Sequence, residues 1–220
     1  MKLKAIITGA TGMVGEGVLH ECLQHNDVEE VLVVGRRSCG IKHPKLKELI
    51  TPDLFDLSSI KEQLSGYNAC FFCLGVSSIG MKVEQFYKLT YTLTMNFATI
   101  LASQNPGMIF CYISGAGTYS SEKGKLMWAR VKGKTENELA KLPFKKVYKF
   151  RPGILKPTKG LKNTLSFYKY LGWLLPVIKL FSPNLISTLK QLGLAMINAA
   201  SKGYEKQEIE VSDIIALSKR

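Results

Sequence analysis

The sequence predicts an α/β fold in which a doubly wound parallel sheet carries helices on both faces. Short apolar runs alternate with segments of helical spacing through residues 1–153. Parallel strands need crossover connections of about a dozen residues or more, and helices supply them. The chain has 220 residues, 46% hydrophobic and 21% charged, enough for one substantial core. Residues 154–220 are predicted to form a small helical lid region packed on the same domain.

The elements of the sheet are expected in a regular order. Strands are expected at residues 4–8, 28–36, 46–54, 69–75, 107–114 and 145–153, the third carrying the weakest pattern. Helices are expected at Met13–Gln24, Leu57–Leu64, Lys82–Ser103 and Lys125–Leu142. Strands separated by helices in this way pair in parallel through right-handed crossovers.

The pattern breaks down after Pro152. The most apolar segment, "LSFYKYLGWLLPVIKLF", holds two lysines and a proline, whereas a membrane-spanning helix needs about 20 residues with few charges. We therefore expect a buried lid helix over a substrate cleft within residues 155–185, with a helix lying on a membrane surface as the alternative. Helical spacing returns at Leu185–Ala200, and "QEIEVSDII" is expected to add a short strand.

The charge of the chain is uneven. The net charge is +13, and residues 141–204 contain twelve Lys or Arg and no Asp or Glu. Such asymmetry indicates an anionic partner, such as a phosphorylated substrate, an acidic protein, a membrane surface or nucleic acid; the alternative is a solvated basic face. The sequence shows no helix-turn-helix and no aromatic stacking motif, so nucleic-acid binding is not expected.

The cysteines and histidines give no metal or redox signature. The apolar N-terminal run is too short for an export signal, so we expect a cytoplasmic protein with reduced thiols. "CFFC" has redox-motif spacing, but Cys70 and Cys73 would point to opposite faces of a strand. The three histidines lack ligand spacing, and no metal is expected; they are His20, His25 and His43.

The loop after the first apolar run carries three glycines spaced three apart, Gly9, Gly12 and Gly15. Between a strand and a helix, such glycines permit a tight turn, close approach of a pyrophosphate and close helix packing. The helix N-terminus then offers free N–H groups and a positive dipole end to the phosphates. The loop therefore predicts a dinucleotide site.

The end of the second strand predicts which dinucleotide is bound. An NAD site places an acidic residue there for the ribose 2′-hydroxyl. This chain reads "VVGRRS", and the guanidinium groups of Arg36 and Arg37 could fork onto a 2′-phosphate. We therefore expect NADP(H); the alternative is two solvated loop arginines.

These segments resemble a known family. "TGATGMVG" resembles the TGxxGxxG fingerprint of extended and atypical short-chain dehydrogenases/reductases, in particular the Tat-interacting-protein oxidoreductases and their bacterial epimerase-like relatives. "PDLFD", "CLG", "YISGAG" and "FRPG" resemble that family's later landmarks. With the glycines and arginines, the resemblance implies cofactor contacts from Thr11, Met13, Val14, Asp53, Leu54, Leu74, Gly75, Val76, Lys132 and Pro152.

The catalytic residues of the family are matched only in part. The family uses a Ser, a Tyr and a Lys four residues after the Tyr, because positions i and i+4 share a helix face. Ser114 and Lys132 match, but "WARVK" places Trp128 where the Tyr belongs. Water or Tyr119 would have to donate the proton, since Tyr112 should point away from the site or into the core. Loss of a positioned acid costs about 10²–10⁴ in rate.

A further position is suggested by the resemblance. Asn96, in "TMNFAT", matches an Asn that holds a proton-relay water in the family; a plain surface Asn is the alternative.

Two functions remain open on the sequence. The first is an NADP(H)-dependent oxidoreductase of atypical type, acting on an unknown carbonyl or anionic small molecule. The second is a protein that senses NADPH, or interacts with partners, without turning the cofactor over. Sugar-nucleotide epimerisation would need the missing Tyr and a larger substrate domain. Family members often dimerise through the fourth and fifth helices, so a homodimer is also expected.

Overall fold

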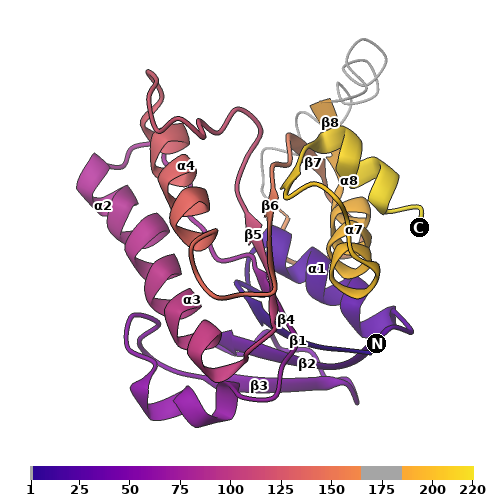
Figure 1. Ribbon diagram of the computed structural model, residues 1–220. Coiled ribbons are helices and arrows are strands. Elements are labelled where there is room, and N and C mark those ends of the chain that lie inside the picture. The colour runs from indigo at the N-terminus through magenta and orange to yellow at the C-terminus, as the bar shows by residue number, and fades with distance from the viewer. Residues whose placement is uncertain (1, 165–184) are drawn as a thin grey trace.

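A computed structural model describes residues 2–164 and 185–220. Its centre is a seven-stranded parallel sheet in the order β3-β2-β1-β4-β5-β6-β9 (Figure 1). The strands are β1 (Leu3–Thr8), β2 (Val28–Gly35), β3 (Leu46–Ile50), β4 (Ala69–Phe72), β5 (Ile109–Ile113), β6 (Lys146–Phe150) and β9 (Glu208–Ile209). The predicted doubly wound α/β fold is confirmed.

Helices cover both faces of this sheet (Figure 1). One face carries α1 (Met13–Gln24), α7 (Leu189–Lys202) and α8 (Val211–Leu217). The other carries the 3₁₀ helix Ser58–Leu64 and a long helix made of α2 (Val83–Tyr87), a π-helical turn Lys88–Thr92 and α3 (Leu93–Gln104), followed by α4 (Met127–Leu139). Neighbouring strand residues alternate between the two cores, as strand geometry requires: Ile7 and Phe71 pack on the α1 side, Ile6 and Phe72 on the α3 side.

The same alternation determines which face of the sheet each cysteine of the "CFFC" segment packs on. Cys70 packs in the core on the α3 side, whereas Cys73 packs against the core on the α1 side. All five cysteines are free thiols. The prediction that Cys70 and Cys73 face opposite ways is confirmed.

The C-terminal elements differ from the expected ones. Residues 186–188 form a strand, β8 (Ile186–Thr188), which pairs in parallel with β7 (Ile154–Lys156) in a separate small sheet. The helix predicted from Leu185 therefore begins at Leu189, where Thr188 Oγ1 accepts the Gln191 N–H at 3.0 Å. In "QEIEVSDII" only β9 is extended, and α8 follows it directly.

Residues beyond 153 complete the central layers of the molecule. β9 pairs with the last residues of β6, and α7 packs along α1. The loop after β7 is also fastened to α1: the buried Glu16 carboxylate accepts the N–H groups of Lys162 and Asn163 at 2.8 and 2.7 Å. Most of the predicted lid helix, residues 165–184, lies outside the described residues. In the part of the chain that the structure describes, no helix is long and apolar enough to cross a membrane.

Candidate functional site

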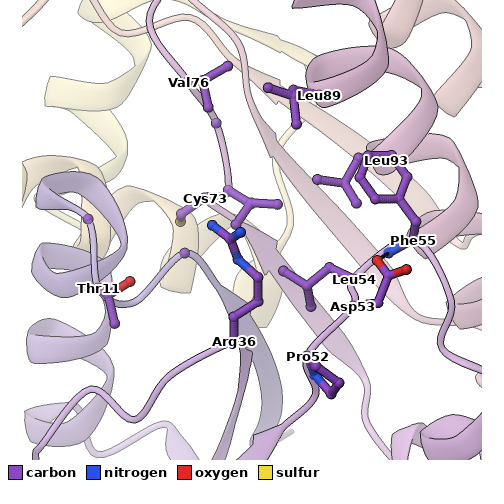
Figure 2. A pocket seen from close by; sticks show the side chains of 14 residues that line it. Thr11, Arg36, Pro52, Asp53, Leu54, Phe55, Cys73, Val76, Leu89 and Leu93 are labelled. Atoms are coloured by element: carbon purple, nitrogen blue, oxygen red, sulfur yellow. Dashed lines mark hydrogen bonds between the residues drawn. The ribbon is translucent and has the colours of Figure 1, made fainter. Parts of the chain in front are cut away.

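A groove of about 300 Å³ opens at the carboxyl ends of β1, β2 and β4. The sheet order reverses between β1 and β4, and this is where open α/β sheets bind their ligands. The lining comes from the glycine loop, the end of β2, the loop after β3, the loop after β4 and the long helix (Figure 2). The lining residues are Gly9, Thr11, Gly12, Arg36, Pro52, Asp53, Leu54, Phe55, Cys73, Leu74, Gly75, Val76, Leu89 and Leu93.

Each glycine of the loop has a separate physical reason. Gly9 has a φ of +72°, and a Cβ there would lie 2.8 Å from the carbonyl oxygen of Cys73. A Cβ on Gly15 would lie 2.1 Å from the carbonyl oxygen of Gly9, so this glycine lets the helix pack on the turn. Gly12, the N-cap of α1, lines the groove, and its nearest neighbour would be 3.4 Å away. Gly9 thus permits the turn, Gly15 permits the close packing of the helix, and Gly12 leaves space open at the helix N-terminus.

Most of the predicted cofactor residues line this groove. Arg37 lines an adjoining hollow together with Arg36 and Gly35. Met13 and Val14 lie in the first turn of α1 and are partly buried against the core. Lys132 and Pro152 are not among the lining residues; the Pro152 carbonyl accepts the Ala116 N–H at 3.0 Å.

Five lining residues were not predicted: Pro52, Phe55, Cys73, Leu89 and Leu93. Pro52, Phe55 and Cys73 are each next in the sequence to a residue that was predicted. Leu89 and Leu93 are four residues apart and share one face of the long helix, so helical spacing alone could have indicated them.

Arg36 and Asp53 hold different positions along the groove. Figure 2 shows the Arg36 side chain extending between Cys73 and Leu54. Asp53 Oδ1 accepts the Phe55 N–H at 2.8 Å, which fixes the turn after β3. Both charged side chains lie toward the β2–β3 side of the groove, and the end formed by Val76 and Leu89 is apolar.

A hydroxyl pair occupies the carboxyl end of β5. The buried Ser114 Oγ lies 3.0 Å from Thr118 Oγ1, which itself donates to the Gly115 carbonyl at 2.7 Å. A carbonyl can only accept, so the Thr118 proton is committed and Ser114 must donate to Thr118. Ser114 therefore presents an acceptor rather than a donor toward a ligand. No motif in the sequence indicates Thr118.

Lys132 reaches the same strand end from α4. Its Nζ donates to the carbonyls of Ile113 and Ser114 at 3.1 and 3.0 Å. Burial lowers the pKa of Lys132 to about 8, and the negative charge of Glu136 opposes this shift. The structure thus brings Ser114 and Lys132 together as predicted from the sequence.

Three aromatic side chains lie in the segments that carry Ser114 and Lys132. The Trp128 ring packs on Gly115, whose added Cβ would lie 3.4 Å from Trp128 Cζ3. The Tyr119 ring lies over Gly124, where an added Cβ would be 2.3 Å from Cε2. Tyr112 is buried in the core on the α3 side, as expected, and burial raises its pKa.

Asn96 is exposed on α3. An exposed amide favours the alternative of a surface residue over a relay at the buried Ser114, and the relay role stays a prediction.

The arginine of "FRPG" is part of a buried ionic cluster. Arg151 Nε donates to Glu136 Oε1 at 3.0 Å, and its Nη2 donates to Ser120 Oγ at 2.6 Å. Glu208 and Glu210 lie 3.3 Å from the Arg151 Nη1, and Glu136 is fully buried. These carboxylates raise the pKa of Arg151. The cluster ties β6, α4 and the loop after β5 together and is structural.

Comparison with known proteins agrees with this geometry. Residues 5–145 match the NAD dependent epimerase/dehydratase family. The FMP52-1 protein of Scheffersomyces stipitis is 26% identical over 213 residues, 93% of this chain and 91% of that protein. HTATIP2 of Rattus norvegicus is 25% identical over 152 residues, 68% of this chain and 64% of that protein.

Solved structures share the fold. The ADP-L-glycero-D-manno-heptose-6-epimerase of Helicobacter pylori superposes with a TM-score of 0.67 at 17% identity, over 99% of this chain and 81% of that one. The Bordetella bronchiseptica enzyme WbmF, solved in complex with NAD⁺, gives 0.65 at 14% identity, over 99% and 77%.

The comparisons also correct one expectation. FMP52-1, FMP52-2 and the FMP52 protein of Debaryomyces hansenii are all named mitochondrial. The prediction of a cytoplasmic protein is therefore wrong. It rested on the short apolar run at the N-terminus, which does not identify a compartment.

The fold, the glycine loop at the reversal of strand order and the family match over residues 5–145 converge on one assignment. The chain belongs to the NAD dependent epimerase/dehydratase family, as an atypical short-chain dehydrogenase/reductase with a groove for a nicotinamide dinucleotide.

Proposed function

We propose that this protein is an NADP(H)-dependent oxidoreductase. The observation that carries the proposal is Arg36, which lines the groove immediately after β2 ends at Gly35, with Arg37 in the adjoining hollow. An acidic residue at this place would accept the ribose 2′-hydroxyl of NAD, whereas a guanidinium attracts the 2′-phosphate of NADP. Hydrogen bonds to charged groups contribute about 1.5–3 kcal/mol, which is a preference of tenfold or more.

The test is a titration with NADPH and, separately, NADH, followed by energy transfer from tryptophan to the reduced nicotinamide. NADPH should bind at least about tenfold more tightly than NADH. Replacing both Arg36 and Arg37 by Ala should remove this difference and leave NADH affinity unchanged. Lys47→Met is the matched control, because it also removes a positive charge but lies on β3, paired with Glu30. Equal loss of both cofactors, or no loss, would contradict the proposal.

The source of the transferred proton is the second part of the proposal. A bound nicotinamide would supply or accept the hydride, and the protein must move a proton at the substrate oxygen. Trp128 has no hydroxyl, and Ser114 donates its proton to Thr118. Because the Tyr119 ring lies over Gly124, we favour water as the donor. Tyr119→Phe should then leave turnover within about twofold, and a solvent isotope effect should remain. A large loss in this variant would assign the proton to Tyr119.

A second candidate function is favoured by a specific observation. The Lys132 ammonium and the Ser114 hydroxyl are both engaged by protein groups, as expected for a site that binds NADPH without turnover. The two functions separate in one assay: NADPH oxidation is followed with a panel of aldehydes and ketones. Tight NADPH binding without oxidation in any of them would favour the sensing or interaction protein.

A further inference from the structure

Most of the exposed large apolar side chains among the described residues lie in the segments that follow β4 and β5. Among the described residues, six large apolar side chains are exposed. Four of them belong to the segments that follow β4 and β5 at the carboxyl edge of the sheet, and we call these four the apolar rim: Val76, Ile79, Val83 and Leu126. Clustered exposed apolar surface marks a binding site, whereas isolated side chains need no explanation.

The loop after β4 holds its most apolar residue out into solvent. Ile79 is 89% exposed. It stands in a tight turn in which the Met81 N–H donates to the Ser78 carbonyl at 3.2 Å and Gly80 takes a φ of +75°. A turn of this kind normally carries polar residues. An isoleucine at its apex is therefore costly in water, and it indicates that something covers it.

The rim is continuous with the cofactor groove. Val76 belongs to both, and Leu89 and Leu93 extend the apolar lining inward (Figure 2). Val83 stands at the start of α2 and Leu126 directly before α4, and α2 packs against α4. The half-buried Trp128 ring, packed on Gly115, adds an aromatic surface next to Ser114.

Charge separates the two ends of the groove. The charged lining residues are Arg36 and Asp53, both away from the end at which Val76 and Leu89 lie. A ligand running from Ser114 past Val76 therefore meets aliphatic and indole surface. A sugar nucleotide would leave its hydroxyl groups without partners on these four side chains.

We propose that the substrate of this site is a carbonyl compound or alcohol with an apolar chain, whose reacting carbon lies by Ser114 and whose chain covers the rim. This inference rests on the proposed oxidoreductase function and names its substrate class. Each methylene fully removed from water strengthens binding about fourfold, so half-covered methylenes should give about twofold each.

The test uses an uncharged fluorescent probe, N-phenyl-1-naphthylamine, with the protein loaded with NADPH. The probe should bind saturably, and 1-decanol should displace it at a concentration at least about tenfold lower than 1-hexanol does. The double variant Ile79→Ser, Val83→Ser should weaken probe binding at least about fivefold. Ile50→Ser is the matched control, because Ile50 is also exposed but ends β3, the outermost strand of the sheet, which is separated from β4 by β2 and β1. NADPH affinity should be unchanged in all variants.

Two results would overturn the inference. The first is probe binding that the double variant leaves unchanged. The second is self-association, measured by sedimentation, that the double variant abolishes while the probe still binds; the rim would then be an interface between copies of the chain. Failure of the proposed oxidoreductase function is detected by different measurements. It would appear as loss of NADPH binding or as absence of NADPH oxidation with hexanal and decanal. Displacement of the probe by 1-decanol would still show whether the rim binds an apolar chain.

Discussion

The two halves of the carboxyl edge of the sheet are built on opposite principles. Around β1, α1 and β2 the site depends on glycines, which have no side chain. Gly12 leaves open space at the helix N-terminus, and Gly9 and Gly15 allow two backbone segments to lie close together. Around β5 and α4 the site is filled. Ser114 is bonded to Thr118, and Lys132 to two carbonyls of the strand end.

This difference teaches where a ligand can be bound without rearrangement. The groove beside α1 offers N–H groups and a positive dipole end to phosphates. The polar groups beside α4 already have partners in the protein, so a ligand must replace one of these bonds to gain one. If the two halves are separable, a change in one half should leave the property that the other half governs unchanged.

The largest effect is expected from restoring the family acid. Trp128→Tyr places a phenol four residues before Lys132, on the same face of α4 and beside Gly115. If the filled half lacks only this proton donor, NADPH oxidation should rise at least about 100-fold with a panel of aldehydes and ketones. Trp128→Phe is the control, because it removes the indole without adding a hydroxyl. Equal rates in the two variants would show that this half lacks more than an acid.

A large effect on stability is expected at the buried ionic cluster. Glu136→Gln removes the buried charge that pairs with Arg151 and should lower the free energy of unfolding by about 3 kcal/mol, measured by urea denaturation. NADPH affinity should not change, because the cluster lies off the groove. The control is Glu138→Gln on the same helix, a half-buried residue paired with the exposed Lys141, with an expected change within about 0.5 kcal/mol. Loss of NADPH binding in Glu136→Gln would show that the two halves are coupled.

The glycines should separate packing from binding within the cofactor half. Gly15→Ala forces a methyl onto the Gly9 carbonyl and should cost about 2 kcal/mol of stability, seen as a lower Tm. Gly12→Ala meets no backbone closer than 3.4 Å, so its Tm should stay near that of the parent protein. Its methyl group projects where phosphates would approach, and NADPH affinity should fall about tenfold. A Tm loss of equal size in both variants would refute this division of roles.

The cofactor half can be predicted from the sequence further than the other half can. Glycine spacing and strand ends report backbone geometry, so the pattern of residues alone locates Gly9, Gly12, Gly15 and Arg36. It does not locate the hydroxyl pair, because Thr118 meets Ser114 only through the shape of the loop after β5. Helical spacing at Leu185–Ala200 likewise led to the prediction of a helix where the structure has the three-residue strand β8. The pairing of β8 with β7 is a long-range contact, which local spacing does not reveal.

A pH dependence of stability is expected at Lys132. Burial holds its pKa at about 8 in the folded protein, below the ordinary value that the unfolded chain retains. The charged, buried ammonium therefore lowers stability fully below pH 8, and this cost is relieved as the pH rises above 8, where the unfolded state binds more protons than the folded state. The Tm of the parent protein should accordingly rise relative to that of Lys132→Met between pH 8 and pH 10. Lys141→Met on the same helix is the control, because pairing with Glu138 raises the pKa of Lys141 and no change is expected near pH 8. A constant Tm difference for Lys132→Met would mean that water reaches the ammonium, and that the half beside α4 is more open than its hydrogen bonds indicate.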